Sequence, residues 1–318
     1  MKRLRWHFLV VAVASFSIMV TAQETRYAGA FLELGIGARG MAMGSAYVSV
    51  ADDGSAFFWN PAGAATLVRA EASGMYASLF KSLVTHFHVG FTRPLYGAGA
   101  ISFNWVRLSI SDIPRYDSPL LDDPTSTYDT RVSEAGDDPL GAWTQFALTN
   151  APLGYSESHD DALFITLAKL NKLNIDFGWQ YFVIPVSIPI GFNLKLIRQS
   201  VFGNTGSGIG FDFGAMLKFG VDDLLDDSRL GKLSIGLAIK DIWNTKITWD
   251  TQSRHADQIK RSWQIGGSYL QPLPKISGQL LIAYSLNKKF ESPHNLGVEY
   301  LYYNRLALRF GMTGSKFT

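Results

Sequence analysis

The chain has 318 residues, a formal charge of +2, 18% charged residues and 13% aromatic residues. It contains 30 glycines and no cysteine, which excludes disulfides and thiol chemistry. A charge this close to neutral gives no basis for nucleic-acid binding. Beyond the N-terminus no clean run of about 18 apolar residues occurs, so the sequence predicts no membrane-spanning helix.

Residues 1–22 have the pattern of a cleaved secretory signal peptide. Three basic residues precede an apolar run from Phe8 to Val20, and small residues follow where a signal peptidase would cut. The run of 13 residues is shorter than the roughly 20 that a spanning helix needs. Because this segment carries three basic and no acidic residues, the mature chain would have a formal charge of −1.

Glycine, acidic and aromatic residues are concentrated between residues 34 and 65, ahead of the first predicted strand. Those that stand out are Gly35, Gly37, Arg39, Gly40, Gly44, Asp52, Asp53, Phe57, Phe58, Trp59, Asn60, Pro61, Ala62 and Gly63. The glycines permit tight turns and close approach to a neighbouring wall. Asn60 is suited to cap a turn or helix that starts at Pro61.

The two adjacent acids, Asp52 and Asp53, have two possible kinds of partner. They can hydrogen-bond to backbone amides of their own segment, or they can pair with basic residues on the strands that follow. The basic candidates are Lys195, Lys218, Lys240 and Arg309. A simpler interpretation also stays open, in which these residues only hold the segment in place.

Strict alternation begins near residue 70 and continues to the end of the chain. From Ile209 to Phe219 the odd positions are apolar, whereas the even positions are small or charged, as in a strand with two different faces. About eleven or twelve strands are predicted. Their ranges are 70–80, 83–93, 96–110, 161–169, 173–184, 186–200, 207–220, 231–249, 258–271, 275–288, 293–303 and 304–314.

A soluble β-sandwich would also alternate, but three features favour a transmembrane antiparallel β-barrel. The polar face is rich in Gly and Ala, which suits a lumen filled by a plug. Aromatic residues such as Trp105 and Trp263 lie toward strand ends, as interface girdles do. The predicted strands are also longer than those of most soluble sheets. We expect short connections such as Lys81-Ser82 on the periplasmic side and the long 111–160 loop on the extracellular side.

Residues 34–65, with the run Asn60-Pro61-Ala62, resemble the N-terminal segment of FadL-like outer-membrane β-barrels, in particular the PorV/PorQ branch associated with type IX secretion. The stretches 190–195, 208–214, 296–300 and 306–311 look like the same family pattern. The resemblance implies an outer-membrane protein of a Gram-negative-type bacterium, with residues 23–69 as a luminal hatch or plug and 70–318 as the barrel. Family barrels close with fourteen strands, so either the chain is truncated at its C-terminus by two or three strands, which we expect, or the barrel closes with fewer strands.

Two functions follow from the resemblance. The first is a type IX secretion component that binds and shuttles secreted cargo proteins. Its partners would be these cargo proteins, other secretion components and the lipid of the outer membrane. The alternative is a passive transporter of hydrophobic compounds, with a pocket at Phe57, Phe58 and Trp59. A continuous apolar pocket there would favour transport, whereas a sealed plug would favour the shuttle. A barrel that only anchors envelope proteins is a third possibility.

Enzymatic chemistry is not predicted. No nucleophile-and-base set or pair of catalytic carboxylates stands out, so we expect no catalytic residues and no cofactor. His86 and His88 share one strand face, but no third metal ligand is evident nearby, and we expect no metal site.

Overall fold

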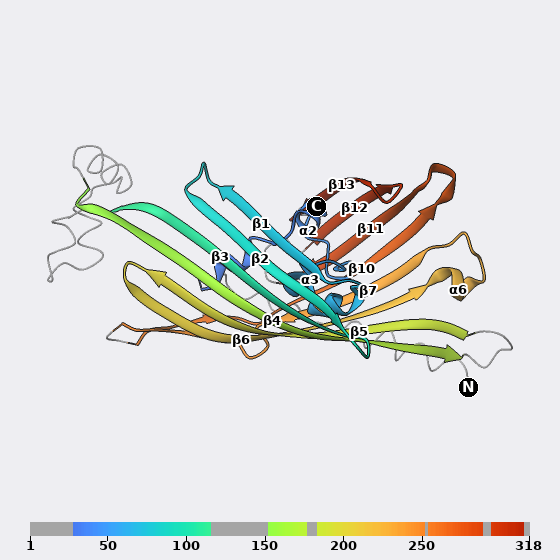
Figure 1. Ribbon diagram of the computed structural model, residues 1–318, viewed down its shortest axis with the longest axis horizontal. Coiled ribbons are helices and arrows are strands. Elements are labelled where there is room, and N and C mark those ends of the chain that lie inside the picture. Colours follow the sequence, from blue (N-terminus) through green and yellow to red (C-terminus); the bar gives the residue numbers. More distant parts are fainter. Residues whose placement is uncertain (1–27, 116–151, 177–182, 252–253, 289–293, 315–318) are drawn as a thin grey trace, which may run out of the picture.

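The computed structural model describes residues 28–115, 152–176, 183–251, 254–288 and 294–314, so the predicted signal peptide and most of the 111–160 loop lie outside the described residues. Within them the chain forms one antiparallel sheet of 13 strands with a few short helices (Figure 1). The strands are β1 (Glu71–Leu79), β2 (Val84–Leu95), β3 (Gly99–Arg115), β4 (Gly154–Asp176), β5 (Val183–Val201), β6 (Asn204–Gly220), β7 (Lys232–Lys240), β8 (Thr245–Trp249), β9 (Ala256–Ile259), β10 (Ser262–Leu273), β11 (Gly278–Asn287), β12 (His294–Tyr302) and β13 (Leu306–Thr313).

The strands follow one another around a curved, barrel-like sheet. The order runs from β1 to β7 and then from β10 to β13, while β8 pairs with β6 and β9. Among the described residues β1 and β13 do not pair with each other, so the sheet has two edges and is not closed. The predicted all-β antiparallel architecture is confirmed, and the predicted closure of a barrel is not observed.

Several strand boundaries differ from the prediction. Part of the predicted 111–160 loop is strand, because β3 continues to Arg115 and β4 begins at Gly154, where the two strands are still paired. Residues 161–169 and 173–176, predicted in separate strands, belong to the single strand β4, whose C-terminal part pairs with β5 as far as Val183. The predicted strand 231–249 divides into β7 and β8, because the chain turns with positive φ at Asp241 and Asn244. Strand β9 was not predicted, since its four residues are too few to show a period.

The sheet has two different ends. At the loop end lie the β1–β2 turn, the 116–151 connection, the β5–β6 turn and the β8–β9 hairpin; at the turn end lie 96–98, 221–231, 274–277 and 303–305. The helices α6 (Val221–Leu225) and η3 (Pro274–Ile276) belong to the turn end. The expectation that Lys81-Ser82 and the 111–160 loop lie on opposite sides is therefore wrong, because β2 and β3 bring both to the loop end.

Residues 28–69, called here the inner segment, lie on the concave face of the sheet between its two walls (Figure 1). The segment contains η1 (Ala30–Glu33), α2 (Ala38–Ala42), α3 (Ala56–Trp59) and η2 (Pro61–Thr66). Tyr47, Val48 and Phe57 are among its fully buried side chains. The hydrophobic core thus forms between this segment and the inward face of the sheet.

Glycines on the inward face let the inner segment approach the strands closely. They are Gly191, Gly214, Gly236, Gly266, Gly297 and Gly311, on six different strands. A Cβ at Gly236 would lie 2.3 Å from the carbonyl oxygen of Val48, and one at Gly311 would lie 2.0 Å from the amide nitrogen of Gly44. Backbone therefore packs on backbone at Gly191, Gly236, Gly297 and Gly311, whereas Gly214 and Gly266 make room for side chains of the segment.

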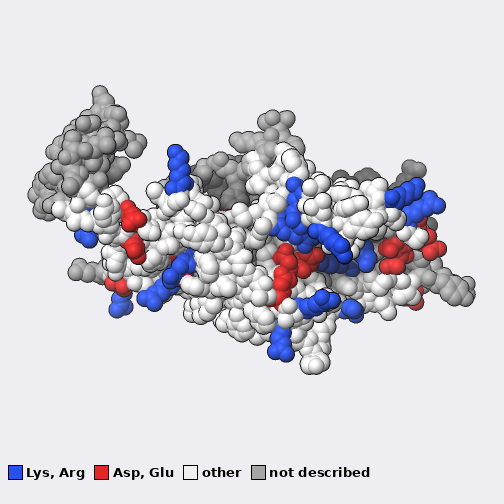
Figure 2. Space-filling model, turned by 45° about the horizontal axis from the view of Figure 1, so that its top comes forward, with Lys and Arg blue, Asp and Glu red and all other residues white. Residues whose placement is uncertain are grey.

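The outward face of the sheet is apolar. Its exposed large side chains include Phe91, Phe103, Leu167, Phe192, Ile209, Ile235, Ile265, Ile282, Leu308 and Phe310. On the face shown in Figure 2, wide uncharged areas separate a few clusters of basic and acidic side chains. No helix in the described ranges is both long enough and apolar enough to cross a membrane.

We predict that Gly236→Ala destabilises the fold, because its methyl group meets the backbone of the inner segment at Val48 and Ser49. Overpacking of this kind costs about 1–3 kcal/mol. The matched control is Gly267→Ala, at an outward-facing glycine whose nearest atom would be 3.9 Å away. Circular dichroism during heating gives the unfolding temperature of each variant. Equal unfolding temperatures of the two variants would contradict the close approach of the inner segment to Gly236.

Candidate functional site

Asn60 joins the inner segment to the wall of the sheet. Its Nδ2 donates to the carbonyl oxygens of Val48 at 2.7 Å, Ala215 on β6 at 3.3 Å and Leu237 on β7 at 3.3 Å. Its Oδ1 accepts a hydrogen bond from the Ala62 amide at 3.1 Å, directly after Pro61, so the predicted cap is confirmed. One fully buried side chain therefore satisfies polar groups of both the segment and the sheet.

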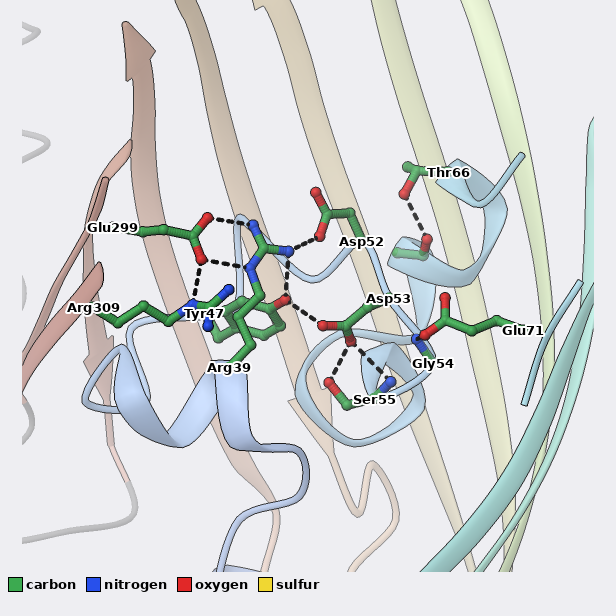
Figure 3. A network of polar contacts seen from close by, with 11 residues as sticks. Arg39, Tyr47, Asp52, Asp53, Gly54, Ser55, Thr66, Glu71, Glu299 and Arg309 are labelled. Carbon is green, nitrogen blue, oxygen red and sulfur yellow. Dashed lines mark hydrogen bonds and ion pairs between the residues drawn. The ribbon is translucent and has the colours of Figure 1, made fainter. Parts of the chain in front are cut away.

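A network of charged groups ties the other half of the inner segment to β12 and β13 (Figure 3). The guanidinium of Arg39 donates twice to the carboxylate of Glu299 on β12, from Nε and from Nη2, each at 2.9 Å. Arg309 on β13 donates to the same carboxylate. Glu299 is only 3% exposed, so a buried carboxylate is shared by two guanidinium groups.

The network continues along the segment itself. The second arm of Arg39 donates to Asp52 and to the hydroxyl of Tyr47, and that hydroxyl donates to Asp53 at 2.7 Å. Asp53 also accepts hydrogen bonds from the amide and hydroxyl of Ser55. Of the two kinds of partner expected, Asp53 has a backbone amide of the segment, that of Ser55, whereas the basic partner of Asp52 is Arg39 of the segment and not one of the predicted strand residues.

Burial and neighbouring charges set the protonation of this network. Burial opposes the charge of Arg39, but its hydrogen bonds to Glu299 and the charge of Asp52 outweigh this effect and raise its pKa. Burial also raises the pKa of the Tyr47 hydroxyl, against the lowering effect of the nearby Arg39. Arg39 thus stays a cation and Tyr47 a neutral donor throughout the physiological range.

A second buried charge cluster lies on the sheet. The ammonium of Lys195 on β5 is 2.9 Å from Asp212 on β6 and 2.6 Å from Asp241 after β7. Asn193 donates to Asp212 at 3.1 Å and to the carbonyl oxygen of Phe57 at 2.7 Å. Lys195, one of the predicted partners of Asp52 and Asp53, is therefore satisfied by acids of the sheet.

The inner segment separates two cavities. The turn-end cavity has a volume of about 910 Å³ and borders on Arg39, Asp52, Asp53 and Glu299. The loop-end cavity has a volume of about 360 Å³ and borders on Glu33, Phe58, Trp59 and Lys240. The two cavities have no lining residue in common, so the segment stands between them.

The three consecutive aromatic residues of the predicted pocket have different surroundings, and only two of them border a cavity. Phe57 is 1% exposed and stacks on His88 with 5.1 Å between ring centroids. Phe58 and Trp59 reach the wall of the loop-end cavity, although they are only 6% and 4% exposed. The indole nitrogen of Trp59 donates to the carbonyl oxygen of Ile36, which fixes the ring against the segment.

The glycines and remaining residues of the predicted motif have structural positions. Gly35, Gly37 and Gly44 have positive φ, as the prediction of tight turns required. A Cβ at Gly40 would meet the ring of Trp59 at 2.6 Å, and one at Gly63 would meet the carbonyl oxygen of Ala51. Both positions therefore need glycine for space.

His86 and His88, which share one face of β2, are the histidines whose surroundings bear on metal binding. No group of three or more His, Cys, Asp or Glu side chains placed to hold a metal occurs in the part of the chain that the structure describes. His88 is hydrogen-bonded to Asn104 at 3.2 Å, and both His86 and His88 are buried beneath the inner segment.

The fold and site together define a class: an antiparallel meander whose concave face is filled by its own N-terminal segment. No protein-family model matches the chain, and no curated protein matches it either.

We predict that Asn60→Asp strongly destabilises the packing of the inner segment. The substitution keeps the cap on Ala62 but replaces a donor by an acceptor facing three carbonyl oxygens. A loss of at least about 2 kcal/mol is expected. The control Asn174→Asp changes an exposed residue of β4. Chemical denaturation measures both; equal stability of the two variants would contradict the role of Asn60.

Glu299→Gln is expected to loosen the contact between the inner segment and β12, because it leaves Arg39 and Arg309 without their buried counter-charge. Breaking a buried pair costs about 3 kcal/mol. Limited proteolysis should then cut within residues 28–69 faster than in the wild type. Glu157→Gln, at an exposed position beside His159, serves as the control; unchanged cleavage of the Glu299 variant would refute the prediction.

Proposed function

We propose that this protein is an outer-membrane β-barrel protein of the PorV/PorQ type that binds secreted proteins at the cell surface and does not conduct solutes. Three observations support the proposal: the apolar outward face, the aromatic residues at both ends of the sheet, and the occupied interior. The resemblance of residues 34–65 to the family agrees with it.

The outward face has the dimensions that a bilayer requires. At about 3.3 Å per residue, the 12 residues of β2 suffice to cross a hydrocarbon core of about 30 Å when tilted. The paired charges of Arg107 and Asp161, beside Trp105, lie on the outward face at the middle of β3, in register with Phe87 near the loop end of β2. Such a pair fits the polar boundary of an apolar band.

Exposed aromatic side chains mark both ends of that band. Tyr96 and Tyr303 lie at the turn end, whereas Phe202 and Trp243 lie at the loop end. Aromatic girdles at the two membrane interfaces are typical of outer-membrane barrels. Because the longer connections gather at the loop end, we propose that this end faces the outside of the cell.

The observation that carries the choice of binding over conduction is that the inner segment occupies the concave face. The segment packs against glycines of β5, β6, β7, β10, β12 and β13, and Asn60 anchors it to β6 and β7. The turn-end and loop-end cavities do not share a wall residue. An interior occupied in this way favours a function at the rim and the loops, where cargo would bind.

Transport of hydrophobic compounds is the second candidate. The loop-end cavity, with Phe58 and Trp59 in its wall, is the observation in its favour. Transport would require the inner segment to move, because the segment separates this cavity from the turn end. The two candidates therefore differ in whether the segment must leave its place.

A tethering experiment separates the candidates. Because the chain contains no cysteine, Gly54→Cys with Ser73→Cys places the only thiols where a Cβ at Gly54 would lie 2.9 Å from that of Ser73 on β1, and the atoms nearest to it belong to side chains. With the disulfide closed, co-purification of secreted proteins should equal that of the reduced form. Loss of capture on closure, or uptake of fatty acids by cells that closure abolishes, would contradict the proposal; the Gly54→Cys and Ser73→Cys single variants control for the substitutions.

The orientation is tested by surface labelling. Ser82→Cys and Asn304→Cys each place a thiol in a short turn with positive φ, the first at the loop end and the second at the turn end. On intact cells an impermeant maleimide should label the Ser82 variant and spare the Asn304 variant until the outer membrane is opened. The reverse pattern would invert the proposed orientation, and equal labelling in both would argue against membrane insertion.

A further inference from the structure

The turn-end cavity contains a row of hydrogen-bond donors that the structure leaves unused. Strand pairing places Lys172, Ser187, Lys218, Ser234 and Ser268 side by side across β4, β5, β6, β7 and β10. All five line the same cavity. Since adjacent strands are about 4.8 Å apart, Lys218 lies within reach of a serine on each side.

None of these five side chains has a hydrogen bond or ion pair with another described residue. This sets Lys218 apart from Lys195, which is held between two aspartates on the same inward face. No carboxylate of the described residues forms an ion pair with Lys218; the charge of Asp52 acts on it from farther away, and Asp52 is itself paired with Arg39. A partly buried ammonium in this position is costly. Such a group gains most from a ligand that supplies negative charge.

The acids that border the cavity are mostly engaged elsewhere. Glu299 and Asp52 are bound by Arg39, and Asp53 accepts hydrogen bonds from Tyr47 and Ser55. Asp223 lies on α6 at the mouth of the turn end. The available donors around Lys218 are therefore ammonium and hydroxyl groups, whereas both guanidinium groups of the cavity already face Glu299.

We propose that the turn-end cavity binds a phosphate-bearing organic anion, with the phosphate at Lys218 between Ser187 and Ser234. A phosphate accepts hydrogen bonds in several directions at once, which matches donors that converge from three strands. A carboxylate would be better matched by a guanidinium fork, and the forks here are occupied. The cavity volume of about 910 Å³ is in the range of small-molecule sites.

The cavity also has an apolar wall for the rest of the ligand. Val50, Leu281 and Leu301 line it beside the donor row. This wall fits an alkyl or other apolar group attached to the phosphate. The same chemistry has two sources, a lipid headgroup and a soluble phosphate compound, and the experiment uses one probe for each. The proposal does not depend on cargo binding or on transport.

The test uses the purified full-length chain in a neutral detergent. Inorganic phosphate and dodecyl phosphate are titrated by calorimetry, and the shift in unfolding temperature is recorded with each. Lys218→Met should weaken binding of the probe by about tenfold or more, as loss of one charge-assisted hydrogen bond does. The control Lys246→Met, at an exposed residue of β8 outside the cavity, should bind like the wild type.

Stability without ligand supplies an independent readout. Because Lys218 has no partner to leave unpaired, Lys218→Met should unfold at the wild-type temperature or above it. If that variant does not fold, Ser187→Ala with Ser234→Ala tests the same site. Binding of both probes, or of dodecyl phosphate alone, supports the proposal and identifies a soluble or a lipid source respectively. Absence of binding at millimolar concentrations, or equal binding by the Lys218 variant, overturns it.

Discussion

Close approach between two backbones is the constraint on which this structure depends. The inner segment can lie on the sheet only where the strands carry glycine, because at Gly191, Gly214 and Gly236 a methyl group would already collide with it. Buried backbone in turn needs hydrogen-bond partners, and the Asn60 side chain supplies them for Val48 and two strands. The glycines thus supply the space for the inner segment, and Asn60 supplies hydrogen bonds to the backbone groups buried beside them.

That constraint explains how much of the fold follows from sequence. Alternation with a Gly-rich inward face predicted both the strands and a filled interior, since small residues on every second position need something to pack against. The cap at Asn60 followed from local chemistry alone. The partner of Asp52 could not be predicted in this way. Arg39 binds Asp52 and also the carboxylate of Glu299, which is 260 residues away in the sequence. Such pairs depend on curvature of the sheet, which no local pattern encodes.

The two ends of the molecule differ in chemistry as a consequence of where the segment lies. At the turn end charged groups surround the larger cavity, and Arg39 links segment and wall there. At the loop end Phe58 and Trp59 line the smaller cavity, and the β8–β9 hairpin belongs to the same end. We therefore propose that binding takes place at the two ends of the molecule, with small anions at the turn end and larger partners at the loop end.

The central claim is that residues 46–65 are a permanent part of the core. Hydrogen–deuterium exchange on the protein in lipid nanodiscs tests it most directly, since it reports opening of each backbone amide. Protection of peptides from this range equal to that of the central strands β5 and β6 is the predicted result. Exchange within seconds, with the strands still protected, would show that the segment leaves the sheet freely and would contradict the account.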